Sequence, residues 1–137
     1  MTYQTNKIAE SASLNETMGL AEGTIVLTMR GEVAVEDLRE GDRVITRDIG
    51  AQPLRAIKRR RAQTTHITKG SLGENRPERD LAVAAGQPLM VRDGAPVAMI
   101  AGDLTQDAGI PTVADLYQLD FGRRHVIYAN GVELAVA

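Results

Sequence analysis

Short apolar runs and turn-forming residues alternate along the chain from Gly23 onwards. Within the runs, apolar and polar residues tend to alternate, and no long stretch repeats its apolar residues with the 3.6-residue period of a helix. This pattern is typical of half-buried strands, so the sequence predicts an all-β fold of many short strands and hairpins. We expect strands over residues 24–29, 33–35, 43–47, 54–61, 81–85, 89–91, 97–100, 116–121, 125–129 and 132–136.

Turn signals predict how some of these strands are joined. Asp93-Gly94 and Asn130-Gly131 each stand between two apolar runs, as residues of tight hairpins do. Residues 122–124 predict a further hairpin that pairs the run before them with the run after them. Residues 70–80 contain many turn formers and charges, so they predict a loop.

The length of the chain, 137 residues, is that of one domain. Residues 1–18 are polar and show no period, so we interpret them as an N-terminal leader, followed by one domain over residues 19–137. The leader has no apolar stretch long enough for a secretory signal. No apolar run approaches the roughly 18 residues that cross a bilayer, so a cytoplasmic protein is expected.

Composition narrows the chemistry further. The chain has no cysteine, which excludes disulfides, thiolate nucleophiles and cysteine-ligated zinc. Its formal net charge of -2 gives no bulk attraction to nucleic acid or to a membrane surface, so neither is expected as a partner. The only two histidines, His66 and His125, are far apart in the sequence. We therefore predict no metal site and no cofactor.

A series of motifs, each weak alone, occurs here in a specific order. Their residues are Gly23-Thr24, Gly31, Val35-Glu36-Asp37-Leu38, Gly41-Asp42, Val44 to Asp48, Gln52 to Arg55, Gly70 to Gly73, Arg79 to Val83, Leu116 to Leu119 and His125 to Val132. Together they resemble the Hint domain, the fold shared by the autoprocessing part of Hedgehog proteins and by inteins. The nearest resemblance is to a bacterial branch that opens with Cys-Phe-x-x-Gly-Thr and continues with a strand, a glycine turn, Val-Glu-x-Leu-x-x-Gly-Asp and Val-x-Thr-x-Asp.

The resemblance implies a self-cleavage reaction that needs particular side chains. Its first-residue cysteine attacks the preceding carbonyl, and the family's Ser/Thr-x-x-His block supplies a proton to the scissile amide. The equivalent positions here are Gly19 for the nucleophile, and Ala84 and Gln87 for the block. Only the penultimate histidine is kept, as His125, and the terminal His-Asn pair needed for splicing is missing. A Hint fold also predicts that Gly19 and His125 lie close together.

These departures favour a catalytically degenerate Hint-like domain. We expect it to serve as a scaffold or protein-interaction module, with a protein partner or a second copy of itself. One alternative is residual autoproteolysis near Met18-Gly19 by a route without the first-residue nucleophile. The other alternative is a small β-barrel unrelated to Hint, such as a ligand-binding one. The scarcity of aromatic residues argues against a sugar or nucleobase site in such a barrel.

Two other features have a functional and a structural interpretation. His125 is either a relic of acid–base chemistry or, as we favour, a strand residue bonded to a neighbouring carbonyl or to Asp120. Residues 58–61, Lys-Arg-Arg-Arg, are either a phosphate or acidic-partner contact or, as we favour, like charges that guard an edge strand. No aromatic residues are interleaved with them for base stacking.

The remaining candidates are interpreted structurally. His66 lies in a polar strand and is expected to be exposed. Thr24 and Thr28 are predicted to be strand residues rather than replacement nucleophiles. Asn130-Gly131 is predicted to be a hairpin turn rather than a site of deamidation or cyclisation.

Overall fold

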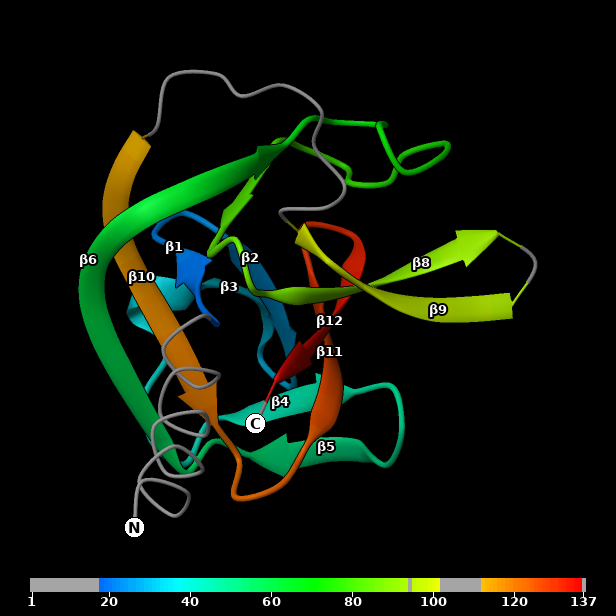
Figure 1. Ribbon diagram of the computed structural model, residues 1–137. Helices are drawn as coiled ribbons and strands as arrows, with labels where there is room; N and C mark the ends of the chain where they lie inside the picture. Colours follow the sequence, from blue (N-terminus) through cyan, green and yellow to red (C-terminus); the bar gives the residue numbers. More distant parts are fainter. Residues whose placement is uncertain (1–17, 94, 102–111, 137) are drawn as a thin grey trace, which may run out of the picture.

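The structure, a computed structural model, describes residues 18–93, 95–101 and 112–136. Strands dominate these residues, together with one short 3-10 helix, which confirms the all-β prediction (Figure 1). The predicted leader, apart from Met18, lies outside the described residues. The elements are β1 (Leu20–Ala21), β2 (Ile25–Thr28), β3 (Gly31–Ala34), η1 (Val35–Asp37), β4 (Arg43–Thr46), β5 (Gly50–Pro53), β6 (Ala56–Ile67), β7 (Leu81–Val83), β8 (Pro88–Asp93), β9 (Ala95–Ile100), β10 (Thr112–Asp120), β11 (His125–Ala129) and β12 (Val132–Val136).

The strands form two sheets. β1, β10, β6 and β7 close into a small barrel, in which β6 curves alongside β10 and pairs with it over the full length of β10 (Figure 1). The second sheet has the order β3-β2-β4-β11-β12-β8-β9, with β5 paired to β4. The β8–β9 hairpin of this sheet extends away from the rest of the molecule on the side opposite β6 (Figure 1).

The core is aliphatic, as the scarcity of aromatic residues requires. Alternation of side chains along the strands sends one set inwards: Val26 and Thr28 of β2 are buried while Ile25 and Leu27 are half-buried on the other face. The same alternation along β11 buries Ile127. The main core cluster combines residues of both sheets, among them Leu20, Val26, Val44, Leu81, Val83, Leu89, Leu119, Ile127 and Leu134.

Two of the predicted hairpins are present. Asn130 and Gly131 have φ of 48° and 78°, and they join β11 to β12 in register from Ala129↔Val132 onwards. Positive φ at both central residues is the requirement that makes Asn-Gly a favoured two-residue hairpin turn. β8 and β9 pair as predicted, in register up to Asp93↔Ala95, although Gly94 itself lies outside the described residues.

The hairpin predicted around residues 122–124 is wrong. β10 pairs with β6 and β1, whereas β11 pairs with β12, β2 and β4. The turn instead carries the chain from the barrel into the second sheet. The carboxylate of Asp120 accepts a hydrogen bond from the N–H of Gly122 at 2.7 Å and stabilises this turn. Turn residues indicate where a chain reverses, but the long β6–β10 pairing decides which strands meet.

Candidate functional site

Gly19 lies buried at the entrance to β1, in the wall of the barrel. The next residue, Leu20, pairs with Tyr117 of β10 on one side and with Val83 of β7 on the other. Gly19 has a φ of 156°, and a Cβ atom at this position would lie 3.1 Å from the Cβ of Leu116. The side chain of Leu116 in β10 therefore crowds the space that a side chain at residue 19 would need.

Gln87 is fully buried beside this glycine, with 1% of its surface exposed. Its Oε1 accepts a hydrogen bond from the N–H of Gly19 at 3.0 Å. Its Nε2 donates to the carbonyl of Ala135 at 2.6 Å and to that of Pro88 at 3.1 Å. One carboxamide thus satisfies polar groups at the start of β1, at the start of β8 and in β12.

Ala84 completes this cluster through its backbone. Its N–H donates to the carbonyl of Gly19 at 3.0 Å, and its own carbonyl accepts from the N–H of Gln87 at 3.0 Å. Beside the cluster is a cavity of about 10 Å³, lined by Met18, Gly19, Leu20, Gln87, Tyr117, Gln118, Leu119 and Val136. A cavity of about 10–15 Å³ holds one water molecule at most, so the space between these residues is almost filled.

His125 is buried in a different set of contacts. Its Nδ1 lies 2.7 Å from Oδ2 of Asp48, and its ring meets that of Phe121 edge to face at a centroid distance of 5.9 Å. The expectation of Asp120 as its side-chain partner is wrong, because the β4–β5 turn brings Asp48 to the start of β11. Burial alone would raise the pKa of Asp48, but hydrogen bonds from His125 and from the Val126 N–H hold that pKa below its usual value.

Comparison with known proteins identifies the family. The family model described as "Hint domain" matches residues 18–135, which is most of the chain. The chain belongs to the Hint domain family. A search of curated proteins found no significant sequence match.

Solved structures resemble this Hint domain in fold. The bacterial intein-like domain from Clostridium thermocellum has a TM-score of 0.58 at 18% identity, covering 86% of this chain and 96% of that one. The gp41-1 intein has a TM-score of 0.60 at 14% identity, covering 85% and 97%. The MchDnaB-1 intein has a TM-score of 0.57 at 13% identity, covering 86% and 99%. At these identities the likeness concerns the fold.

Three of the four residues that the motif comparison predicts as site positions come together in this Hint domain. Gly19, Ala84 and Gln87 are joined directly by hydrogen bonds, although they lie up to 68 residues apart in the sequence. The ring of His125 is directed to Asp48 instead. His125 is connected to the cluster through one residue: Val136, its partner in β12, lines the same small cavity as Gly19.

The threonines near the start of the Hint domain have structural roles. The hydroxyl of Thr24 donates to the carbonyl of Ala21 at 2.7 Å. The hydroxyl of Thr28 donates to the carbonyl of Gly31 at 2.7 Å and accepts from the N–H of Arg30 at 3.2 Å, which closes the β2–β3 turn. Both side chains are buried; Thr28 belongs to β2, as predicted, whereas Thr24 lies just before it.

The other charged candidates lie on the barrel surface. His66 is exposed, as predicted, and its Nε2 lies 3.4 Å from the hydroxyl of Thr64. The basic residues 58–61 belong to the part of β6 that pairs with β10, and β7 pairs only with Thr65–Ile67. Arg61 forms an exposed ion pair with Asp115 at 3.4 Å. Among the described residues no group of three or more His, Cys, Asp or Glu side chains is arranged to hold a metal ion.

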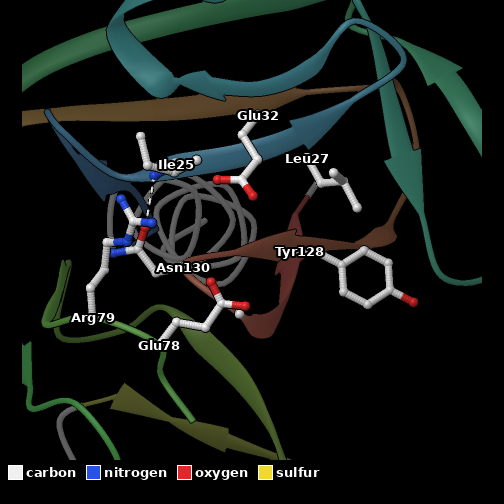
Figure 2. A pocket seen from close by; sticks show the side chains of 8 residues that line it. Ile25, Leu27, Glu32, Glu78, Arg79, Tyr128 and Asn130 are labelled. Carbon is white, nitrogen blue, oxygen red and sulfur yellow. Dashed lines mark hydrogen bonds between the residues drawn. The ribbon is translucent and has the colours of Figure 1, made fainter. Parts of the chain in front are cut away.

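A second cleft contains charged residues that the sequence reasoning missed. It has a volume of about 270 Å³ and is formed by the outer face of β2, β3 and β11 and by the loop before β7 (Figure 2). The charged residues are Glu32, Glu78 and Arg79, and Tyr128 lies beside them. No spacing in the sequence indicates that β3, the loop before β7 and β11 meet in this way.

The structure also bears on membrane association. No helix in the described ranges is long and apolar enough to cross a membrane.

Proposed function

We propose that this Hint domain does not cleave its own chain at Met18-Gly19 and that it acts as a scaffold or protein-interaction module. Self-cleavage by this fold depends on a nucleophile at the first residue and an acid that protonates the leaving nitrogen. A glycine and a glutamine stand at the two matching positions. The remaining use of the domain is its folded surface, offered to a protein partner or to a second copy of the chain.

The hydrogen bond from the Gly19 N–H to Gln87 Oε1 carries this proposal. An amide that donates its proton keeps the nitrogen lone pair in resonance with the Met18 carbonyl, which stabilises the planar peptide bond. Departure of that nitrogen requires a proton, and the Gln87 carboxamide supplies an acceptor oxygen there instead. The Nε2 protons of Gln87 are engaged by the carbonyls of Ala135 and Pro88, away from the amide.

The packing around Gly19 supports the same proposal. A nucleophilic side chain begins at Cβ, and the Cβ of Leu116 stands 3.1 Å from where this atom would lie. Because the Cβ of Leu116 is fixed to the β10 backbone, a nucleophile at residue 19 requires β10 to move. The packing around residue 19 therefore favours a glycine.

A cleavage assay tests the loss of activity. The chain is fused behind a carrier protein, incubated with and without thiol or hydroxylamine, and weighed by mass spectrometry. We expect an intact fusion, and a product cut between Met18 and Gly19 would contradict the proposal in favour of residual autoproteolysis. The matched variant combines Gly19→Cys, Ala84→Ser and Gln87→His. It is expected to give weak thiol-induced cleavage, weak because of the crowding against Leu116.

Self-association tests the scaffold role separately. Sedimentation velocity over a wide concentration range measures whether the chain forms a defined oligomer, and chemical crosslinking in its native extract identifies a stoichiometric partner. A chain that stays monomeric at every concentration and crosslinks to no partner would contradict the scaffold role. That result would leave the proposal of lost cleavage unchanged.

A further inference from the structure

Asn130 builds the cleft shown in Figure 2 by fixing three segments to one another. Its N–H donates to the carbonyl of Ile25 at 2.9 Å, and its Oδ1 accepts from the N–H of Ile25 at 2.8 Å. Its carbonyl accepts from the N–H of Glu78 at 2.8 Å, and its Nδ2 donates to the carbonyl of Asp80 at 3.1 Å. The loop that carries Glu78 is thereby held over the outer face of the β2 and β11 strands.

The glycine after this asparagine leaves room for the Glu78 side chain. A Cβ atom on Gly131 would lie 2.4 Å from the Cγ of Glu78. The Glu78 side chain therefore lies directly against the hairpin turn, and its position is linked to the geometry of that turn. The wall of the cleft that carries Glu78 is therefore held in place by the hydrogen bonds between this loop and Asn130.

Two carboxylates enter the cleft from opposite walls. Figure 2 shows Glu32 reaching from β3 and Glu78 from the loop toward the space between them. In the described part of the chain neither carboxylate forms an ion pair or a hydrogen bond. Arg79 lines the other side, beside Asn130, and it also forms no ion pair among those residues (Figure 2). Two carboxylates and one guanidinium give the cleft a net negative charge.

The rest of the lining is apolar. Ile25 and Leu27 form the floor on the outer face of β2, and Tyr128 of β11 adds an aromatic ring. A cation on an aliphatic stem gains from these groups, because the carboxylates attract its charge, and the apolar floor and the ring cover its stem. The volume of about 270 Å³ lies just below the range of drug-sized ligand pockets, which begins at about 300 Å³, so the cleft suits a small group.

We infer that this cleft binds a primary ammonium group carried on a short aliphatic stem, the chemistry of a lysine side chain or of a free alkylamine. The ammonium lies between Glu32 and Glu78, and the stem lies on Ile25 and Leu27 toward Tyr128. Arg79 opposes the cation and limits the affinity. This inference rests on the cleft alone and holds whether or not the domain cleaves itself.

Nuclear magnetic resonance titration of the full chain tests the inference. The probe is N-acetyl-lysine methylamide, and the neutral control is the same molecule acetylated at Nζ. We expect the cationic probe to shift the amide signals of Tyr128, Gly131 and Glu32 at millimolar concentrations, and the neutral control to leave them in place. A comparison with pentylammonium distinguishes the sources: tighter binding of the lysine probe indicates a polypeptide, and tighter binding of pentylammonium indicates a free amine.

Neutralising the acidic residues and neutralising the basic residue of the cleft are expected to change the affinity for the lysine probe in opposite directions. We expect Glu32→Gln and Glu78→Gln each to weaken binding about two- to five-fold, the size of an exposed ion pair, since both side chains are exposed. Arg79→Gln is expected to strengthen binding by a similar factor, and Glu40→Gln, which alters an exposed carboxylate elsewhere, is expected to have no effect. Three results would overturn the inference. They are equal binding of the lysine probe and its acetylated control, a loss of affinity in Glu40→Gln equal to that in the two cleft variants, and no signal shift with either the lysine probe or pentylammonium.

Discussion

The N–H of Gly19 donates a hydrogen bond to Oε1 of Gln87, 68 residues further along the chain, at 3.0 Å. The same carboxamide donates to the carbonyls of Ala135 and Pro88. The side chain of Gln87 thus holds together the first barrel strand and two strands of the second sheet. The position has a structural role in this chain that can be measured as stability.

Replacement of Gln87 by alanine is expected to lower the free energy of unfolding by about 2–4 kcal/mol. The change leaves the Gly19 N–H and the Ala135 carbonyl buried without their partner, and each such group costs about 1–3 kcal/mol. Urea unfolding followed by circular dichroism measures the difference.

The matched control for this variant is Gln63→Ala, on the exposed side of β6. It removes the same side chain from a strand without a buried hydrogen bond, so its effect is expected to stay within about 0.5 kcal/mol. Equal losses in the two variants would show that the Gln87 hydrogen bonds contribute nothing specific.

Replacement of Gly19 by alanine is expected to destabilise the domain by about 1–3 kcal/mol, because the added methyl group overpacks the contact with Leu116. Gly41→Ala is the control: its φ of 91° is also unfavourable for alanine, but no atom lies within 4 Å of the added carbon. A Gly19→Ala variant as stable as the wild type, in the same urea titration, would mean that β10 adjusts freely. The steric argument against a nucleophile would then fail.

The sequence predicts the strands well because alternation and turn chemistry are local. β2, β4, β11 and β12 follow directly from the alternation, and the Asn130-Gly131 turn follows from its need for positive φ. The short strands β1 and β5 are missed. β1 has only two residues, Leu20 and Ala21, so it is held by its neighbours rather than by its own pattern.

The contacts between distant segments are the part that local patterns do not contain. The family motif indicates Gly19, Ala84 and Gln87 as one cluster, and the structure brings them together. The motif also contains Asp48, but nothing in it assigns that residue to His125, because the pairing depends on where the β4–β5 turn meets β11. The four hydrogen bonds of Asn130 are missed for the same reason.

Replacement of Asn130 by glycine is expected to cost about 2–4 kcal/mol of unfolding free energy. Glycine accepts the φ of 48° that the turn requires, so the variant isolates the loss of the side-chain bonds to Ile25 and Asp80. Asn75→Gly is the matched control, because Asn75 has a φ of 56° and is exposed. Similar unfolding midpoints for both variants would contradict the role of Asn130 in fixing the loop over the hairpin.

Replacement of Asp48 by asparagine is expected to reduce the loss of stability in acid. The folded pKa of Asp48 is lowered, so its contribution is complete above the unfolded value of about 3.9 and disappears as the pH falls through the folded value. Urea midpoints of the variant, measured from pH 5 to pH 2, should therefore fall less steeply than those of the wild type.

Asp42 gives an independent comparison for this acid effect. Hydrogen bonds from Arg30, at 2.9 Å, and from the Arg39 N–H lower the pKa of Asp42, and these groups are separate from His125 and Val126. Asp42→Asn should also make the urea midpoint fall less steeply with decreasing pH. In the variant that carries both Asp42→Asn and Asp48→Asn, the two reductions of this slope should add. A slope in Asp48→Asn identical to that of the wild type would show that the bond between His125 and Asp48 adds nothing to folding, and His125 would then need another explanation for its burial.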